Sequence, residues 1–221
     1  MERIELIHII NYMVKKGYVI YEEPYKLNLF GIRNRTSMVN LFNERIGTFY
    51  KTDRSDNWDI KIYSGTTKPG LYYLRNLINP KGTLILKEGQ YVDTYKIDYH
   101  RGEYLALCQR LKPVTVFRDK NRDDKHDYDI DTLDEGYHGA NIHRASMYQI
   151  LKYVDRSSAG CQVIADPDNF NSLMELAEVH KKLHGNKFTY TLMNEEQLHI
   201  QAVDNWLNKL KTSFVNNFRS N

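Results

Sequence analysis

The sequence has few of the residues that cross-link or interrupt a chain. Among its 221 residues there are two cysteines, Cys108 and Cys161, and five prolines. A chain of this length builds a core without disulfides, so we expect both thiols to be free, as in a protein synthesised in the cytoplasm. With 41% hydrophobic and 27% charged residues, the composition predicts a globular protein of one large or two small domains.

Long runs of one character are also missing. The 31 Lys and Arg residues are scattered among 28 Asp and Glu, so nothing in the sequence calls for a nucleic-acid partner. The first residues include acids where a secretory signal would be basic, and the apolar stretch that follows is interrupted by His8 and Asn11. We therefore expect no signal peptide and no membrane insertion.

Turn residues divide most of the chain into short stretches with the alternation typical of β-strands. Six to nine strands are expected, and the main candidates are residues 18–21, 26–33, 45–50, 58–63, 83–86, 91–97, 103–109 and 114–118. The polar turn at 52–57 predicts a hairpin. Helical periodicity is found near the ends of the chain, at 3–16, 168–184 and 195–214. The pattern predicts a β-dominated α+β fold.

Neither a repeat nor a low-complexity segment nor a clean linker divides the chain. We therefore expect one compact domain made of three parts. These parts are an N-terminal helix with short strands in residues 1–42, a β-rich core in 43–185, and a helical C-terminal extension in 186–221.

Residues 137–164 contain the arrangement that best suits chemistry. His143 comes first, and Cys161 follows behind the small-residue turn Ser158-Ala159-Gly160. A thiolate is a nucleophile, and an imidazole can accept the thiol proton and return it to a leaving amine. Backbone N–H groups of such a turn can bind an oxyanion. A buried structural cysteine and a core histidine are the alternative, and the residues alone leave it open.

His143 and Cys161, with 17 residues between them and the turn Ser158-Ala-Gly-Cys161, resemble the catalytic signature of the L,D-transpeptidases, the YkuD-type cysteine enzymes. The resemblance extends upstream to Ser64-Gly65 and Thr67-Lys-Pro-Gly70-Leu-Tyr-Tyr and downstream to Asp166-Pro-Asp-Asn-Phe170. It implies a YkuD-like catalytic core in residues 43–185. In that core Cys161 would be the nucleophile, His143 the general base, Gly160 part of the oxyanion hole, and Ser158 the residue that shapes the turn.

Two departures from the family pattern concern substrate binding. Ala159 stands where the family has histidine or asparagine. Gln162-Val163 replaces an apolar residue followed by arginine or asparagine, and in the family that arginine holds a substrate carboxylate. Candidates for contacts with the substrate in this chain are Arg144, Arg156, His138, Asn141 and Gln162.

The sequence is most similar to divergent relatives carried by bacteriophages, which are thought to trim peptidoglycan peptides. The resemblance implies a cysteine peptidase acting on stem peptides or crosslinks, as an endopeptidase or carboxypeptidase, at the cell wall after release from the cell or as part of a virion. Transpeptidation is the other outcome of the same acyl-enzyme, and the missing arginine and export signal favour hydrolysis. A non-enzymatic virion or wall-binding protein that meets other virion proteins is the alternative. A peptidase or amidase with an intracellular substrate would share the site.

An acidic loop offers a second candidate site. Asp119, Asn121 and Asp123 place oxygen ligands at alternating positions, as at the start of a calcium loop. Position six of that loop is Asp124 and position twelve is Ile130, where an EF-hand needs glycine and glutamate. We therefore expect no cofactor, with calcium at this loop as the alternative.

Overall fold

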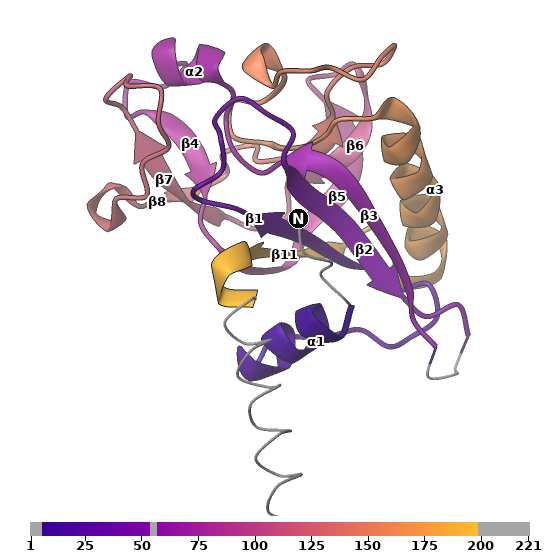
Figure 1. Cartoon of the computed structure of the whole chain (residues 1–221). Coiled ribbons are helices and arrows are strands. Elements are labelled where there is room, and N and C mark those ends of the chain that lie inside the picture. Colours follow the sequence, from indigo (N-terminus) through magenta and orange to yellow (C-terminus); the bar gives the residue numbers. More distant parts are fainter. Residues whose placement is uncertain (1–5, 54–56, 199–221) are drawn as a thin grey trace, which may run out of the picture.

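The structure, a computed structural model, describes residues 6–53 and 57–198 (Figure 1). It is a mixed α+β protein with a large β-sheet, which confirms the class expected from the alternation. Its named helices are α1 (Leu6–Lys15), α2 (Leu71–Arg75) and α3 (Pro167–His184), with the short 3-10 turns η1 (Ile130–Thr132) and η2 (Asp155–Ser157). None of the helices within these residues is long and apolar enough to cross a membrane.

The large sheet closes into a barrel. In the order of their pairing, its strands are β1 (Asn28–Arg33), β11 (Phe188–Asn194), β5 (Gly89–His100), β6 (Tyr104–Gln109), β9 (Ile142–Arg144), β10 (Gln162–Ile164), β3 (Asp59–Thr66) and β2 (Glu44–Tyr50). The hairpins β2–β3 and β5–β6 join neighbours in the sequence and are antiparallel. By contrast, β1 with β11 and β9 with β10 are parallel pairs, formed by segments that a longer connection separates.

A second sheet of three strands lies beside the barrel. It consists of β4 (Thr83–Leu86), β7 (Val114–Asp119) and β8 (Asp134–Gly136). Figure 1 shows this sheet and α3 on opposite sides of the barrel, with α2 above the small sheet. One continuous core joins the barrel, the small sheet and α3. Leu86 and Val116 of the small sheet and Phe170 of α3 belong to the same buried cluster as residues of the barrel strands.

The strand β1 is buried on both faces. Its Leu29 belongs to the main core, whereas Phe30 points the other way and packs with Ile9 and Met13 of α1. The apolar stripe of α1 therefore covers the outside of the barrel. Each large apolar side chain buried in this way stabilises the fold by about 1.5–3 kcal/mol.

The barrel takes strands from all three of the parts expected from the sequence, residues 1–42, 43–185 and 186–221. Residues 188–194, expected to open a helical extension, form the fully buried strand β11, which lies between β1 and β5. Their alternation of threonine with aromatic and aliphatic residues suits a strand. The helix expected from residue 195 is present at 195–198, and its remainder lies outside the described residues. Residues 18–21, expected to be a strand, form none.

Buried charges fix the connection that follows β3. Arg33 is fully buried and donates through Nη2 to Thr67 O at 2.6 Å and through Nε to Thr67 Oγ1 at 3.0 Å. Lys68, which follows Thr67, is also buried, and its Nζ lies 3.1 Å from Oε1 of the buried Glu44. A buried charge is tolerated only with such partners, so this segment has one well-defined path from β3 to α2.

His180 couples stability to pH. It is buried on α3, and its Nδ1 accepts the Leu27 N–H at 2.9 Å while its Nε2 lies 3.1 Å from Lys187 O. Burial lowers the pKa of His180 from 6.5 to about 4. Between these values the unfolded chain binds a proton that the folded protein excludes, so the free energy of unfolding falls as the pH falls from 6.5 towards 4.

The variant His180→Gln tests this coupling, because glutamine keeps one acceptor and one donor but does not titrate. Between about pH 7 and about pH 5, we expect the wild-type protein to lose about 2 kcal/mol more stability than the variant. Urea unfolding of both proteins at the two pH values measures the difference. Equal losses would mean that His180 is not the titrating group.

Candidate active site

The turn before β10 is held by its own serine. Ser158 Oγ donates to Cys161 O at 2.9 Å and accepts the Gly160 N–H at 3.1 Å. Gly160 has a φ of 117°, and a β-carbon added there would lie 2.1 Å from Leu84 O of β4. The Ser158 side chain therefore holds the turn together, and only glycine at position 160 permits the close approach of β4.

The Gly160 N–H, expected to be part of the oxyanion hole, has a partner inside the turn. Because it donates to Ser158 Oγ, it is occupied within the turn and does not serve an oxyanion hole in this conformation. In the part of the chain that the structure describes, the Cys161 N–H forms no hydrogen bond. The candidate oxyanion donor is therefore the amide of the cysteine itself.

Cys161 directly precedes β10, and His143 lies on the adjacent parallel strand β9. Val163 of β10 is the partner of His143 in β9, and the Gln162 N–H donates to Asn141 O at 2.8 Å, which continues the pairing to Cys161. Because side chains alternate along a strand, Cys161 and His143 face the same side of the sheet. Cys161 Sγ contacts Gly139 O at 3.4 Å, and within residues 6–53 and 57–198 no hydrogen bond joins it to the His143 ring.

The His143 ring is oriented by a backbone carbonyl. Its Nδ1 lies 2.8 Å from Arg144 O and 3.3 Å from the Tyr104 hydroxyl. A carbonyl only accepts, so we assign the proton to Nδ1, which leaves the lone pair of Nε2 as the basic site. This is the tautomer that a general base for a neighbouring thiol requires.

A second imidazole, which sequence reasoning missed, covers the first. His100, at the end of β5, stacks on His143 with ring centroids 4.1 Å apart, and its Nδ1 accepts from the Asn141 side chain at 3.0 Å. Thus Asn141, a candidate for substrate contact, positions His100. The only signal in the sequence was a histidine beside the predicted turn at Arg101-Gly102, far from residues 137–164.

Burial keeps both reacting groups neutral at neutral pH. Burial, followed by the nearby His100, lowers the pKa of His143 to about 3. Burial also raises the pKa of the Cys161 thiol above its usual value, although a backbone hydrogen bond from Asn141 and the charge of Arg101 oppose this. The free protein therefore holds a thiol and a neutral imidazole, so the thiol proton moves to the imidazole only as the sulfur attacks an electrophile.

Two hollows meet at His100 and Arg101, which line both. The first, here called the thiol pocket, has a volume of about 480 Å³ and is lined by Cys161, Ala159, His138, Asn141 and Leu84 among others. The second, here called the arginine pocket, also measures about 480 Å³ and is lined by His143, Tyr104, Arg101, Arg144 and Arg156 among others. Cys161 and His143 thus open into adjoining hollows.

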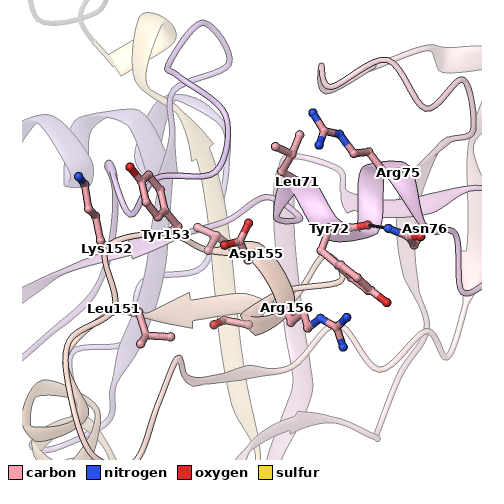
Figure 2. Close-up of a pocket in the computed structure, with 11 residues that line it drawn as sticks. Leu71, Tyr72, Arg75, Asn76, Leu151, Lys152, Tyr153, Asp155 and Arg156 are labelled. Carbon is pink, nitrogen blue, oxygen red and sulfur yellow. Dashed lines mark hydrogen bonds between the residues drawn. The ribbon is translucent and has the colours of Figure 1, made fainter.

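A third hollow continues beyond Arg156. This outer pocket, shown in Figure 2, has a volume of about 630 Å³ and lies between α2 and residues 151–157. Arg156 and Ser157 line it together with the arginine pocket. The three hollows therefore follow one another from Cys161 past His143 to α2.

The remaining sequence candidates divide between surface and interior. His138 lines the thiol pocket, with Nδ1 3.1 Å from the Arg118 guanidinium and Nε2 3.2 Å from Asp134 O. Gln162, in contrast, is fully buried, accepts from the Tyr190 hydroxyl at 3.0 Å, and cannot reach a substrate. Its Nε2 donates to Gly160 O at 3.4 Å, so it supports the cysteine turn from within the barrel.

The acidic loop uses its oxygens internally. Asp119 accepts the Asp127 N–H, Asn121 Oδ1 accepts the Asp123 N–H, and Asp123 Oδ1 accepts the Lys125 N–H. Burial raises the pKa of Asp119 to about 6. Within residues 6–53 and 57–198, no group of three or more His, Cys, Asp or Glu side chains is arranged to hold a metal ion.

Comparisons with known proteins identify no relative among the L,D-transpeptidases, so the resemblance to that family rests on the sequence pattern alone. The chain matches no family model, no curated protein and no solved structure.

Proposed function

We propose that the protein is a cysteine peptidase of the L,D-transpeptidase type that acts on peptidoglycan stem peptides or crosslinks. The observation that carries the proposal is the placement of Cys161 at the start of β10 and of His143 on the adjacent parallel strand β9, with both side chains lining adjoining hollows. A nucleophile, a base in the correct tautomer and a free backbone N–H are thereby brought together.

The reaction begins with a peptide carbonyl in the thiol pocket. The thiol turns from Gly139 O, His143 Nε2 accepts its proton, and Cys161 Sγ bonds to the carbonyl carbon. The Cys161 N–H donates to the oxyanion that forms. When the C–N bond breaks, the imidazolium gives its proton to the departing amine. Water then attacks the thioester, with His143 again as the base, and releases the acid and the thiol.

A contact between distant segments supports the resemblance. The Gly70 N–H, in the upstream stretch that resembles the family, donates to Ser158 O of the cysteine turn at 2.9 Å. A β-carbon on Gly70 would lie 2.2 Å from Asp155 O, so the two segments pack backbone to backbone. The stretches that share the family pattern in sequence thus meet in space, as parts of one site would.

We favour hydrolysis over transpeptidation on the family pattern. Gln162 and Val163 stand where the family places an apolar residue and the arginine that holds a substrate carboxylate, and Gln162 is buried in the barrel. On the resemblance to phage-borne relatives, we propose that this activity belongs to a lysin, or to a virion component that acts at the cell wall.

One observation favours the non-enzymatic alternative. Cys161 Sγ contacts Gly139 O and forms no hydrogen bond with His143 in the described part of the chain, and burial raises the pKa of the thiol. A virion or wall-binding protein that keeps the barrel would carry such an inert cysteine. Alkylation by iodoacetamide separates the two functions, because it responds to the base that serves the thiol.

We expect Cys161 to be alkylated at near-neutral pH at least about tenfold faster than Cys108. Cys108 is fully buried, and burial raises the pKa of its thiol to about 11. We also expect His143→Gln to slow alkylation of Cys161 about tenfold or more while leaving Cys108 unchanged. Peptide mass mapping over time measures both rates in one sample. A Cys161 rate that is indifferent to His143→Gln would favour the non-enzymatic protein.

A further inference from the structure

Three arginines converge in the arginine pocket without acidic partners. Arg101, Arg144 and Arg156 line it together with a single acid, Glu103. None of the three forms an ion pair within residues 6–53 and 57–198, whereas Arg33, Arg35, Arg45, Arg75, Arg110 and Arg118 all do. A hollow lined by unpaired guanidinium groups is a binding site for an anion, and a planar carboxylate fits the guanidinium fork.

Aromatic rings hold two of these guanidinium groups in place. Arg144 lies over the Tyr104 ring, with its Cζ 3.9 Å from the ring centroid, and Arg156 lies over the Tyr72 ring at the same distance. Figure 2 shows the Tyr72 ring beside the Arg156 side chain, which extends from the segment below α2. Stacking fixes the orientation of a guanidinium but leaves its charge and its N–H groups available for a ligand.

The pocket lies on the side of the site where the leaving group departs. In the proposed reaction, His143 gives its proton to the departing amine, so that amine must lie next to the imidazole. His143 lines the arginine pocket, whereas Cys161 lines the thiol pocket. The acyl part of the substrate therefore occupies the thiol pocket, and the leaving group extends into the arginine pocket.

We propose that the arginine pocket binds a carboxylate on the residue whose amine departs. The inference rests on the proposed function and specifies its substrate: a peptide in which the amino acid after the scissile bond carries a free carboxylate. A stem peptide with a free terminal amino acid meets this requirement. A peptide with that carboxylate blocked does not.

Binding to an inactive variant tests the pocket without relying on turnover. The probes are a synthetic stem tetrapeptide ending in free D-alanine and the same peptide with a C-terminal carboxamide, titrated calorimetrically into Cys161→Ala. We expect the free acid to bind about tenfold more tightly than the amide. In the Cys161→Ala protein, a second substitution, Arg144→Gln or Arg156→Gln, should weaken binding of the free acid about tenfold and leave the affinity for the amide unchanged. Adding Arg122→Gln, on the exposed loop after β7, should change neither affinity.

The results distinguish failure of this inference from failure of the proposed function. Equal affinity for acid and amide, or no binding of either peptide, overturns the carboxylate pocket. Cleavage of both peptides by the wild-type protein at equal rates also overturns it, while leaving the Cys161 chemistry intact. A preference for the acid that survives both arginine substitutions would place the carboxylate elsewhere and equally overturn the assignment. Thermal unfolding of each variant confirms that it is folded before titration.

Discussion

Replacing Cys161 with alanine is expected to reduce peptide release from purified sacculi by about a thousandfold or more, because no acyl-enzyme can form without the thiol. The substitution removes one half-buried sulfur and its contact with Gly139 O. We therefore expect stability to change by less than about 1 kcal/mol. Release of peptides from dye-labelled sacculi measures the activity, and thermal unfolding reports the fold.

The matched control is Cys108→Ala. Cys108 is the only other cysteine, and it lies fully buried on β6, where its Sγ contacts Asp98 O. Removing it should cost about 1 kcal/mol of stability but leave peptide release within about twofold of the wild-type rate. If Cys161→Ala released peptides at the wild-type rate, Cys161 would not be the nucleophile.

Replacing Gly160 with alanine is expected to cost about 3 kcal/mol or more and to abolish activity with Cys161 still present. The added β-carbon would lie 2.1 Å from Leu84 O and 2.3 Å from Leu84 Cδ1, so the turn must move away from β4. That movement displaces Cys161, the next residue. Urea unfolding and peptide release from sacculi measure the two effects.

Gly17→Ala is the control for backbone strain alone. Gly17 also has a positive φ, of 68°, but no atom lies within 4 Å of the position that its β-carbon would take. It follows α1, far from Cys161 in the sequence, so we expect a loss of about 1 kcal/mol with unchanged peptide release. Equal effects of the two substitutions would show that the packing of Gly160 against Leu84 is not important.

Local patterns predict the elements whose partners are close in the sequence. The hairpin of β2 and β3 follows from the alternation on either side of the polar turn at 52–57. The helix α3 follows from its periodicity, and it begins where Asp166 caps it by accepting the Asp168 N–H. In both cases the residues that decide the structure lie within one short window.

Pairings between strands that are far apart in the sequence could not be predicted in this way. The strand β11 lies between β1 and β5, which are far from it in the sequence, and no local feature specifies such neighbours. The same limit explains why His100 was missed, since its stacking on His143 depends on how β5, β6 and β9 pair. Alternation also cannot tell which face of β10 is inside, and this is why Gln162 was taken for a substrate contact.

The candidate pair itself was visible in the sequence, but its electrostatic state was not. Spacing and the turn at Ser158 indicated Cys161 and His143, and in the structure Cys161 directly precedes β10, which pairs with the strand of His143. The burial that lowers the pKa of His143 and raises that of Cys161 comes from the surrounding strands and from His100. The resting site is therefore a neutral pair, which suits a base that accepts the thiol proton only as the sulfur attacks an electrophile.

Mass spectrometry of the muropeptides from sacculi incubated with the wild-type protein, with Cys161→Ala or with buffer tests the central claim most directly. It reports activity, the bond that is cut and the nucleophile together. We expect peptides shortened at one defined bond with the wild-type protein alone, together with a transient peptide adduct on Cys161. Identical muropeptides in the three samples, or the same shortened peptides with Cys161→Ala, would contradict it.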